Sequence, residues 1–394
     1  MKVVCDRNAL FDAVSVVSGV VNTRSPKPQL ACIKLTATGS EKTGTLLLEA
    51  TDGEVAVRIS SMSVQVLDPG AALIPADKLR QIVGAEDNDT TLTLETEADA
   101  CTITGADAEF TVYGYPAAEF PELPSFADIA GGKTGPKPKD VFHAQSGIIN
   151  SLINKTLFAA ARENTRYAIN GVLMKRDGKK LEMVATDGRR LALCRGTVPA
   201  TKSEGPAASC IVPSKALTLL QKLADDANEP ITIAVTESQA VFAIGGSETT
   251  GEGARATLAT SLVEGTFPPY EDVIPSDQDK KATFDKAVLS SAVKRAALLT
   301  NEESRGVRMS FKGQAKQLEL ASRAPEVGEA TITVELPSYD GDDVDIGFNP
   351  QFIAEALRVV PESEVMLELK STNKPGLLKA GNDFLYVVMP VNLQ

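Results

Sequence analysis

The organisation of this chain is decided by the stretch Met183-Val-Ala-Thr-Asp-Gly-Arg-Arg-Leu-Ala-Leu193. It combines an apolar run, a Thr-Asp-Gly corner and a second apolar run, which is the pattern of two antiparallel strands joined by a tight turn. The segment Leu48-Glu-Ala-Thr-Asp-Gly-Glu-Val-Ala-Val57 carries the same Ala-Thr-Asp-Gly corner 135 residues earlier. Because this spacing is about one third of the chain, the sequence predicts an internal repeat.

Two helical patterns accompany the hairpin in each third of the chain. The first has an apolar face and occupies residues 8–21, 147–161 and 286–299. The second begins at or beside Pro75, Pro213 and Pro350, which are 138 and 137 residues apart. Proline is favoured at helix starts, so this regular spacing supports three copies of one helix-and-strand unit.

The repeat predicts an α+β fold with three similar domains, each made of two helices packed on antiparallel sheets. We expect these domains at residues 1–125, 141–272 and 273–394. Residues 126–140 are rich in Gly, Pro and Lys, which is typical of a linker. The third copy of the hairpin, at residues 321–328, lacks the Thr-Asp-Gly corner, so the three copies are expected to differ in function.

The charge of the chain argues at first against a nucleic-acid partner. The formal net charge is −12 and the isoelectric point is about 4.9, whereas phosphate binding depends on Lys and Arg. A protein that slides along DNA, however, needs only a modest number of basic side chains on one inner surface. The placement of the 40 Lys and Arg residues therefore matters more than their total.

The other composition features exclude several classes of protein. The five cysteines are scattered and His143 is the single histidine, so we expect neither a metal site nor a cofactor. No apolar run approaches the length of a membrane span, and the N-terminus does not resemble a signal peptide. We therefore expect a cytoplasmic protein.

Several motifs, in register over the whole chain, resemble the bacterial DNA polymerase III beta subunits, the sliding clamps. The motifs are Arg24-Ser-Pro-Lys-Pro-Gln-Leu30, Ala185-Thr-Asp-Gly-Arg-Arg-Leu-Ala192, Phe267-Pro-Pro-Tyr270, Arg295-Ala-Ala-Leu-Leu-Thr-Asn-Glu302, Arg305-Gly-Val-Arg308 and Tyr386-Val-Val-Met-Pro-Val-Asn-Leu393. The resemblance implies the DNA clamp fold and a head-to-tail homodimer that closes a ring around double-stranded DNA. It also implies a processivity factor without catalysis, which a clamp loader opens and which tethers the replicative DNA polymerase and repair polymerases through short peptide motifs.

The resemblance also implies functional residues. The partner-peptide pocket is expected at Ile169, Thr186, Gly188, Arg189, Arg190, Leu191, Pro268, Val273, Val387, Val388, Met389, Pro390 and Val391. Contacts to DNA phosphates are expected at Arg24, Arg166 and Tyr167, and the dimer interface at Leu298 and Leu299. Other basic residues on or near the inner helices are candidates for a diffuse positive lining: Lys78, Arg80, Lys155, Lys215, Lys222, Lys294, Arg295 and Arg358. Two positions depart from the family pattern, because Asp272 stands where Arg is common and Arg189 where His is common.

Three alternatives stay open at this point. The two Thr-Asp-Gly corners can be plain hairpin turns, in which the carboxylates of Asp52 and Asp187 serve the turn geometry. The same two carboxylates can be read as the acid and base of a hydrolase, although no Ser, Cys or metal constellation accompanies them. The chain can also be a three-repeat peptide-binding scaffold that never meets DNA.

Overall fold

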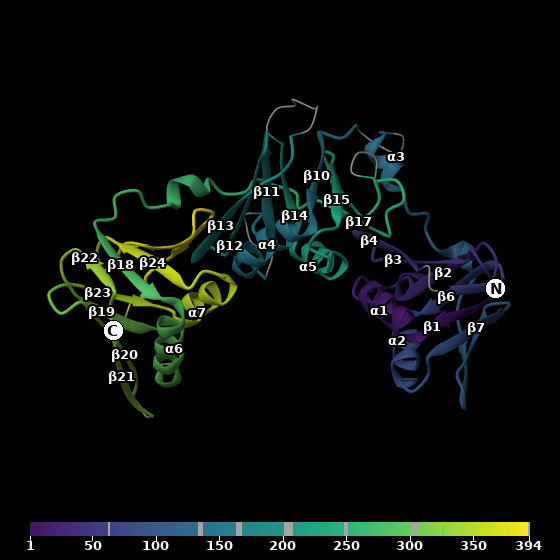
Figure 1. Cartoon of the computed structure of the whole chain (residues 1–394), viewed down its shortest axis with the longest axis horizontal. Helices are drawn as coiled ribbons and strands as arrows, with labels where there is room; N and C mark the ends of the chain where they lie inside the picture. The colour runs from purple at the N-terminus through teal and green to yellow at the C-terminus, as the bar shows by residue number, and fades with distance from the viewer. Residues whose placement is uncertain are drawn as a thin grey trace. The chain divides into compact units, whose positions relative to one another are not determined.

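The computed structural model describes residues 1–61, 64–132, 137–162, 168–200, 208–247, 251–300, 306–325 and 327–392. The chain divides into two compact units. Unit 1 contains Met1–Asn150, Val198–Ala208 and Lys215–Leu262, and unit 2 contains Ser151–Thr197, Ser209–Ser214 and Val263–Gln394. Each unit is organised around one long antiparallel sheet and one shorter sheet (Figure 1).

Unit 1 holds a five-stranded sheet, in the order β5-β1-β7-β8-β9, and an eight-stranded sheet, in the order β10-β15-β16-β17-β4-β3-β2-β6. The strands are β1 (Lys2–Asp6), β2 (Cys32–Thr38), β3 (Thr45–Thr51), β4 (Val55–Ser61), β5 (Val64–Asp68), β6 (Gly70–Pro75), β7 (Thr91–Glu97), β8 (Ala100–Thr104), β9 (Glu109–Tyr113), β10 (Asp140–Gln145), β15 (Pro230–Val235), β16 (Gln239–Ile244) and β17 (Ala256–Ser261). The helices are α1 (Arg7–Val17), α2 (Ala76–Ala85), α3 (Phe126–Ala130), the first part of α4 (Ser146–Thr156) and α5 (Ser214–Leu223), with short 3₁₀ turns η1 (Pro28–Ala31) and η2 (Ala117–Glu119).

Helix α1 illustrates how the predicted pattern forms. Asp6 caps its first turn by accepting the backbone N–H of Ala9 at 2.8 Å, and Leu10, Val14 and Val17 form its buried face. The helix was expected to continue to residue 21 but ends at Val17. The chain turns after Ser18, and Gly19 suits this turn because an added Cβ there would lie 3.0 Å from Leu219 Cδ2.

Unit 2 holds a nine-stranded sheet, in the order β14-β11-β12-β13-β26-β25-β24-β18-β22, and a four-stranded sheet, in the order β21-β20-β19-β23. The strands are β11 (Gly171–Asp177), β12 (Lys180–Thr186), β13 (Arg190–Thr197), β14 (Ala208–Pro213), β18 (Lys280–Asp285), β19 (Val307–Lys312), β20 (Gln317–Ala324), β21 (Gly328–Glu335), β22 (Ser338–Asp340), β23 (Val344–Phe348), β24 (Glu364–Leu369), β25 (Gly376–Ala380) and β26 (Phe384–Val388). The helices are the end of α4, α6 (Lys286–Ala296) and α7 (Pro350–Val359), with 3₁₀ turns η3 (Leu157–Ala159), η4 (Tyr270–Val273) and η5 (Ala297–Leu299).

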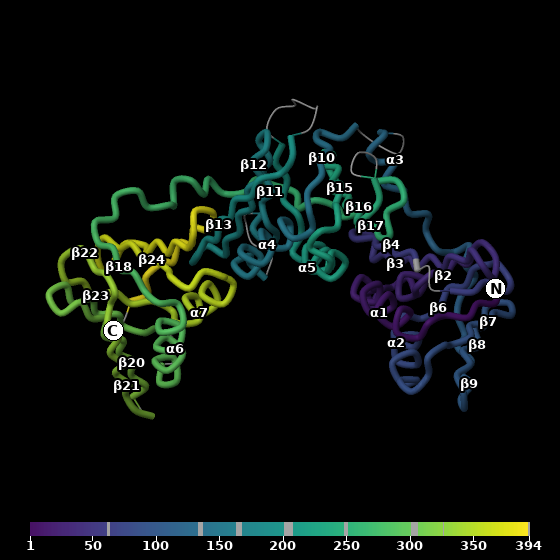
Figure 2. Tube along the Cα trace, viewed as in Figure 1, coloured from purple at the N-terminus to yellow at the C-terminus, as the bar shows by residue number. Residues whose placement is uncertain are grey.

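The predicted hairpins are present in all three copies. Strands β3 and β4 pair so that Thr51 lies opposite Ala56, and β12 and β13 pair so that Thr186 lies opposite Leu191. The second strand of each hairpin then pairs with a strand from much later in the chain, β4 with β17 and β13 with β26. The Cα trace shows β13 beside the C-terminal strands (Figure 2). The third hairpin, β20 and β21, ends its sheet, and β21 has no second neighbour among the described strands.

The segment expected to be a linker contains helix α3. Ser125 and Asp128 form a capping box at its start. Phe126 and Ile129 are buried against apolar residues of β15 and β16, among them Val241. At least the first part of this segment is therefore packed onto the eight-stranded sheet.

Candidate functional site

The corner between β12 and β13 is built by its own polar side chains. The hydroxyl of Thr186 donates to the carbonyl of Arg190 at 2.6 Å and accepts the N–H of Gly188 at 3.1 Å. Asp187 Oδ1 accepts the N–H groups of Arg189 at 2.9 Å and Arg190 at 3.1 Å. Gly188 has a φ of 85°, a conformation that favours glycine. The Thr-Asp-Gly sequence is therefore explained by turn geometry.

The first corner repeats this arrangement and adds an ion pair. Asp52 Oδ1 accepts the N–H groups of Glu54 at 2.9 Å and Val55 at 2.8 Å, and Oδ2 lies 2.5 Å from Lys215 Nζ. Burial alone would raise the pKa of Asp52, but the hydrogen bonds from Lys215 and the backbone outweigh it and hold this pKa below its ordinary value. Asp187 likewise lies 3.0 Å from Arg190 Nε. Both carboxylates are thus engaged in structure, which disfavours the hydrolase interpretation.

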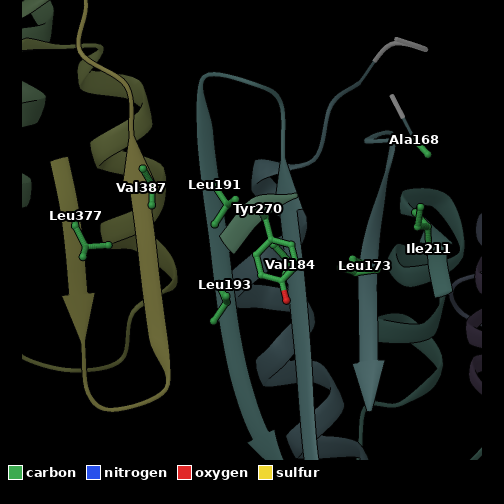
Figure 3. Close-up of a cluster of buried hydrophobic side chains, with 9 residues drawn as sticks. All are labelled: Ala168, Leu173, Val184, Leu191, Leu193, Ile211, Tyr270, Leu377 and Val387. Atoms are coloured by element: carbon green, nitrogen blue, oxygen red, sulfur yellow. The ribbon is translucent and has the colours of Figure 1, made fainter. Parts of the chain in front are cut away.

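One face of the nine-stranded sheet carries an apolar cluster where β13 meets β26. Leu191 lies opposite Val387, and Val387 lies opposite Leu377 of β25. Side chains opposite each other in an antiparallel pair point to the same face, so these three form a row. The cluster, shown in Figure 3, comprises Ala168, Leu173, Val184, Leu191, Leu193, Ile211, Tyr270, Leu377 and Val387.

The segment that follows β17 packs on this cluster. Phe267 and Ile274 are half-buried against it, and the rings of Phe267 and Tyr270 meet edge to face with centroids 6.2 Å apart. The Tyr270 hydroxyl donates to Glu182 Oε1 at 2.6 Å, and burial and this carboxylate raise the pKa of Tyr270 above its ordinary value. Figure 3 shows the Tyr270 ring in front of Val184. We call residues 263–275 the strap, because Tyr270 ties them to the sheet.

Apolar side chains at the margin of the cluster stay open to solvent. Val273, at the end of the strap, is 46% exposed, and Met389, directly after β26, is 38% exposed. They are among the few large apolar side chains in the described residues that are exposed to this extent. Exposed apolar side chains beside a buried apolar cluster are typical of a surface that another protein covers.

Two of the expected pocket residues point to the opposite face of the sheet. Arg190 lies opposite Val388, one residue out of step with the Leu191 row. The Arg190 guanidinium contacts Glu355 of α7, donates to the Phe158 carbonyl at 2.9 Å and lies 4.4 Å from the ring centroid of Phe352. These contacts hold strand β13 against α7, so Arg190 supports the cluster from the opposite face of the sheet.

The chain after β26 continues from the cluster to a pocket. The N–H of Met389 donates to the Arg189 carbonyl at 2.9 Å, and the N–H of Val391 donates to the Gly347 carbonyl at 2.8 Å. A pocket of about 520 Å³ lies here. Its lining residues are Arg308, Asp345, Ile346, Gly347, Thr372, Asn373, Pro390, Val391 and Asn392. Pro390 and Val391 were expected to line the partner pocket; the other seven were not.

The remaining expected pocket residues lie in or near the same region. Ile169 and Thr186 are buried, Gly188 and Arg189 are exposed at the tip of the hairpin, and Pro268 is half-buried in the strap. The residues that sequence reasoning missed are mainly cluster members on neighbouring strands, such as Leu173 and Leu377. Their strands are typical of any sheet, and no local signal marks them.

The expected DNA contacts are only partly described. Arg24 is exposed, and its N–H donates to Asn22 Oδ1 at 3.0 Å. Arg166 and Tyr167 lie outside the described residues. Lys155 is 5% exposed and its Nζ lies 2.8 Å from Asp383, so it is not available to a phosphate. Lys215 is paired with Asp52, as described above.

The two expected interface leucines differ in exposure. Leu298 is 78% exposed, whereas Leu299 is half-buried. In the described part of the chain, no three His, Cys, Asp or Glu side chains are grouped so that they hold a metal ion. No described helix has the length and apolarity to cross a membrane.

Comparison with known proteins agrees with this architecture. Family models match three successive parts of the chain, described as the N-terminal, central and C-terminal domains of the DNA polymerase III beta subunit, at residues 1–124, 144–269 and 271–392. The beta sliding clamp of Pseudomonas putida is 32% identical, with 98% of both chains covered. That of Escherichia coli K12 is 29% identical, with 100% of both covered. A crystal structure of the Pseudomonas aeruginosa sliding clamp bound to griselimycin has a TM-score of 0.87 and 30% identity, with both chains fully covered.

The chain therefore belongs to the DNA polymerase III beta subunit family, the sliding clamps. The resemblance drawn from the sequence motifs and the predicted α+β clamp fold are both confirmed. The boundaries at 1–125, 126–140, 141–272 and 273–394 and the individual site residues stay predictions. The two long sheets run across those boundaries, since β4 pairs with β17 and β13 with β26.

Proposed function

We propose that this chain is a DNA processivity factor that closes a ring around double-stranded DNA as a head-to-tail homodimer and has no catalysis of its own. It acts in the cytoplasm, where it tethers the replicative polymerase and repair polymerases and is opened by a clamp loader. The observation that carries the proposal is the full-length family match combined with the apolar cluster and its exposed margin at Val273 and Met389.

The arrangement of strands supports ring closure between two copies. In each long sheet, the hairpin strand of one repeat pairs with the last sheet strand of the next repeat, as β4 does with β17 and β13 with β26. The equivalent strands that remain are β21, at the edge of the four-stranded sheet, and β9, at the edge of the five-stranded sheet. Edge strands with unpaired backbone groups invite pairing. Joining β21 of one copy to β9 of another would combine the four-stranded and five-stranded sheets into a third long sheet, and two such joints close a ring.

The exposed Leu298 supports the same interface. Counting from the first residues of α4 and α6, Leu298 corresponds to Phe158. Phe158 is covered within unit 2, since its ring centroid lies 5.7 Å from that of Tyr386 and 5.5 Å from the Arg190 guanidinium. Leu298 has no such cover and is 78% exposed. A partner subunit that places α2 against η5 would bury it.

Contact with DNA is proposed through phosphates alone, because a clamp must slide over every sequence. Arg24 is exposed, and so are Lys78, Arg80, Lys222, Lys294, Arg295 and Arg358. Lys155 and Lys215 belong to ion pairs within the chain and are left out of this set. A small number of basic side chains in a chain of net charge −12 allows the protein to bind DNA weakly, so that it can slide.

The partner site is proposed at the apolar cluster, its exposed margin and the strap. A pocket lined by aliphatic side chains and a flexible Met accepts several related peptides. Once the ring encircles DNA, a polymerase held there rebinds the template at high effective concentration, which is the source of processivity.

Retention on closed and open DNA tests the proposal. The protein, loaded by a clamp loader, is expected to stay on nicked circular DNA and to be lost when the circle is linearised. Equal retention on both forms would contradict topological binding. A monomer in solution without annular particles would instead favour a peptide-binding scaffold that does not meet DNA.

A further inference from the structure

We propose that the pocket beside the C-terminal strand binds an acidic residue of the partner segment, next to the apolar residues that occupy the cluster. Arg308 would be the main contact. The inference rests on the proposed partner-binding function, and it adds a charge preference that the apolar cluster alone does not supply.

The pocket is open because of a glycine. Arg308 of β19 lies opposite Gly347 of β23, and both line the pocket. Side chains opposite each other share a face, so the missing side chain of Gly347 leaves space beside the Arg308 guanidinium. The turn between β24 and β25 walls one side through Thr372 and Asn373.

Arg308 is available for an external ligand. It is exposed, and within the described part of the chain no carboxylate pairs with it, whereas two lysines of the same unit are engaged. Lys312, on the same strand, lies 3.5 Å from Asp343, and Lys370 lies 3.0 Å from Asp279. A guanidinium presents a planar fork of donors that matches a carboxylate, so Arg308 is suited to bidentate binding.

The neighbouring polar groups agree with an anionic ligand. Ser371 Oγ donates to Asn373 Oδ1 at 3.0 Å, which leaves the amide N–H groups of Asn373 as donors toward the pocket that this residue lines. Asn392 adds a second amide. Asp345 also lines the pocket and opposes an anion, so its charge limits the preference that Arg308 creates.

A second cation lies between the pocket and the cluster. Arg189 is exposed, forms no ion pair with any described residue, and is joined to the C-terminal strand because its carbonyl accepts the Met389 N–H at 2.9 Å. Two residues further on, Val391 is bonded to Gly347 at the pocket. An extended peptide advances about 3.3 Å per residue. A segment anchored near Met389 therefore reaches Arg308 within a few residues.

At the pocket and the hairpin tip, Arg308 and Arg189 form no ion pair with a described residue, and Asp345 is the carboxylate that lines the pocket, in a chain whose net charge is −12. An acidic partner segment is repelled by most of this protein and attracted here. The charges therefore favour docking of such a segment in one orientation, with its acidic part toward Arg308.

The test uses two fluorescent peptides with the same Leu and Phe anchor, one flanked by Asp and Glu and the other by the isosteric Asn and Gln. Binding to the full-length protein is measured by fluorescence anisotropy. At about 50 mM salt the acidic peptide is expected to bind about five-fold more tightly, and the difference is expected to shrink at about 300 mM as screening increases. Arg308→Gln should remove most of this preference without weakening the neutral peptide, and Arg308→Lys should retain part of it. Asp345→Asn should increase the preference.

Lys312→Gln is the matched control, because it removes the same charge from the same strand but takes it from an existing ion pair. It is expected to leave the preference intact. Equal binding of the two peptides to the unaltered protein, or an equal loss in the Arg308 and Lys312 variants, would overturn the inference while leaving the partner site in place. Failure of both peptides to bind would overturn the proposed partner site together with it.

Discussion

The strap offers the most quantitative prediction, because one conservative substitution removes one of its contacts to the sheet and leaves the others, such as the hydrogen bond from the Val263 N–H to the Ile211 carbonyl. Tyr270→Phe removes the hydrogen bond to Glu182, which has a donor–acceptor distance of 2.6 Å, and keeps the ring that packs on Phe267. A hydrogen bond to a charged group contributes about 1.5–3 kcal/mol. In this variant the Glu182 carboxylate still has its ion pair with Arg195, in which Arg195 Nε lies 2.7 Å from Glu182 Oε2. The carboxylate therefore still has a partner. We therefore expect a loss near the lower limit, about 1.5 kcal/mol.

Hydrogen exchange measures this loss where it occurs. If the strap opens locally, a loss of about 1.4 kcal/mol makes its amides exchange about ten-fold faster. Because the strap forms one side of the proposed partner site, the dissociation rate of a bound partner peptide should also rise, by about three-fold to ten-fold.

Tyr339→Phe is the control for this experiment. The Tyr339 hydroxyl donates to the Asp342 carbonyl at 2.6 Å in the same unit, but Tyr339 belongs to neither the cluster nor the strap. Its loss should change exchange around β22 and leave the strap and peptide dissociation unaltered. Unchanged exchange of the strap in Tyr270→Phe would refute the reasoning, and so would an equal effect of the two variants on the peptide.

Three further predictions concern the margin, the interface and the first corner. Met389→Ala is expected to weaken partner-peptide binding by about ten-fold in anisotropy while the dimer stays intact, because it removes an apolar side chain that is 38% exposed; unaltered affinity would place the peptide elsewhere. Leu298→Asp is expected to shift the dimer to monomer in sedimentation. The control Leu67→Asp, at an exposed Leu on β5, should not change the dimer. An unchanged dimer in Leu298→Asp would count against the proposed dimer interface. The lowered pKa of Asp52 means that its contribution to stability is present above about pH 3.8 and disappears as the pH falls through the lowered value. Lys215→Met should therefore flatten this acid-induced loss in urea unfolding, and an identical pH profile would show that the pair does not contribute.

The chain has two junctions at which a hairpin strand pairs with the last strand of the next repeat: β4 with β17 in the first and β13 with β26 in the second. Their side chains explain why the apolar cluster lies only at the second junction. In the second junction the row across the strands is Leu191, Val387 and Leu377. The corresponding row in the first junction is Ala56, Ala259 and Val241. These side chains are smaller, and Phe126 and Ile129 of α3 pack against Val241 and Ala259. The first junction thus has a shallower apolar surface that the chain itself covers.

Much of the fold followed from local signals. The Thr-Asp-Gly corners, the prolines at helix starts and the apolar periodicity depend on residues close in sequence, so the hairpins and paired helices were predictable. Helix α3 was missed because its few residues are surrounded by Gly, Pro and Lys. Its stability comes from burial of Phe126 and Ile129 on a sheet formed by strands about a hundred residues later.

The sequence by itself determined the repeat, the α+β class and the family, and it pointed to the second hairpin as one wall of the proposed site. Only the tertiary structure decided which side chains share a face there. Adjacent residues of a strand point in opposite directions, and the register between β13 and β26 sends Leu191 and Val387 to the cluster but Arg190 and Val388 to α7. The partners of Tyr270 and Lys155 lie 88 and 228 residues away in the chain. Pairings over such distances are set by how the sheets assemble, and no local pattern encodes them.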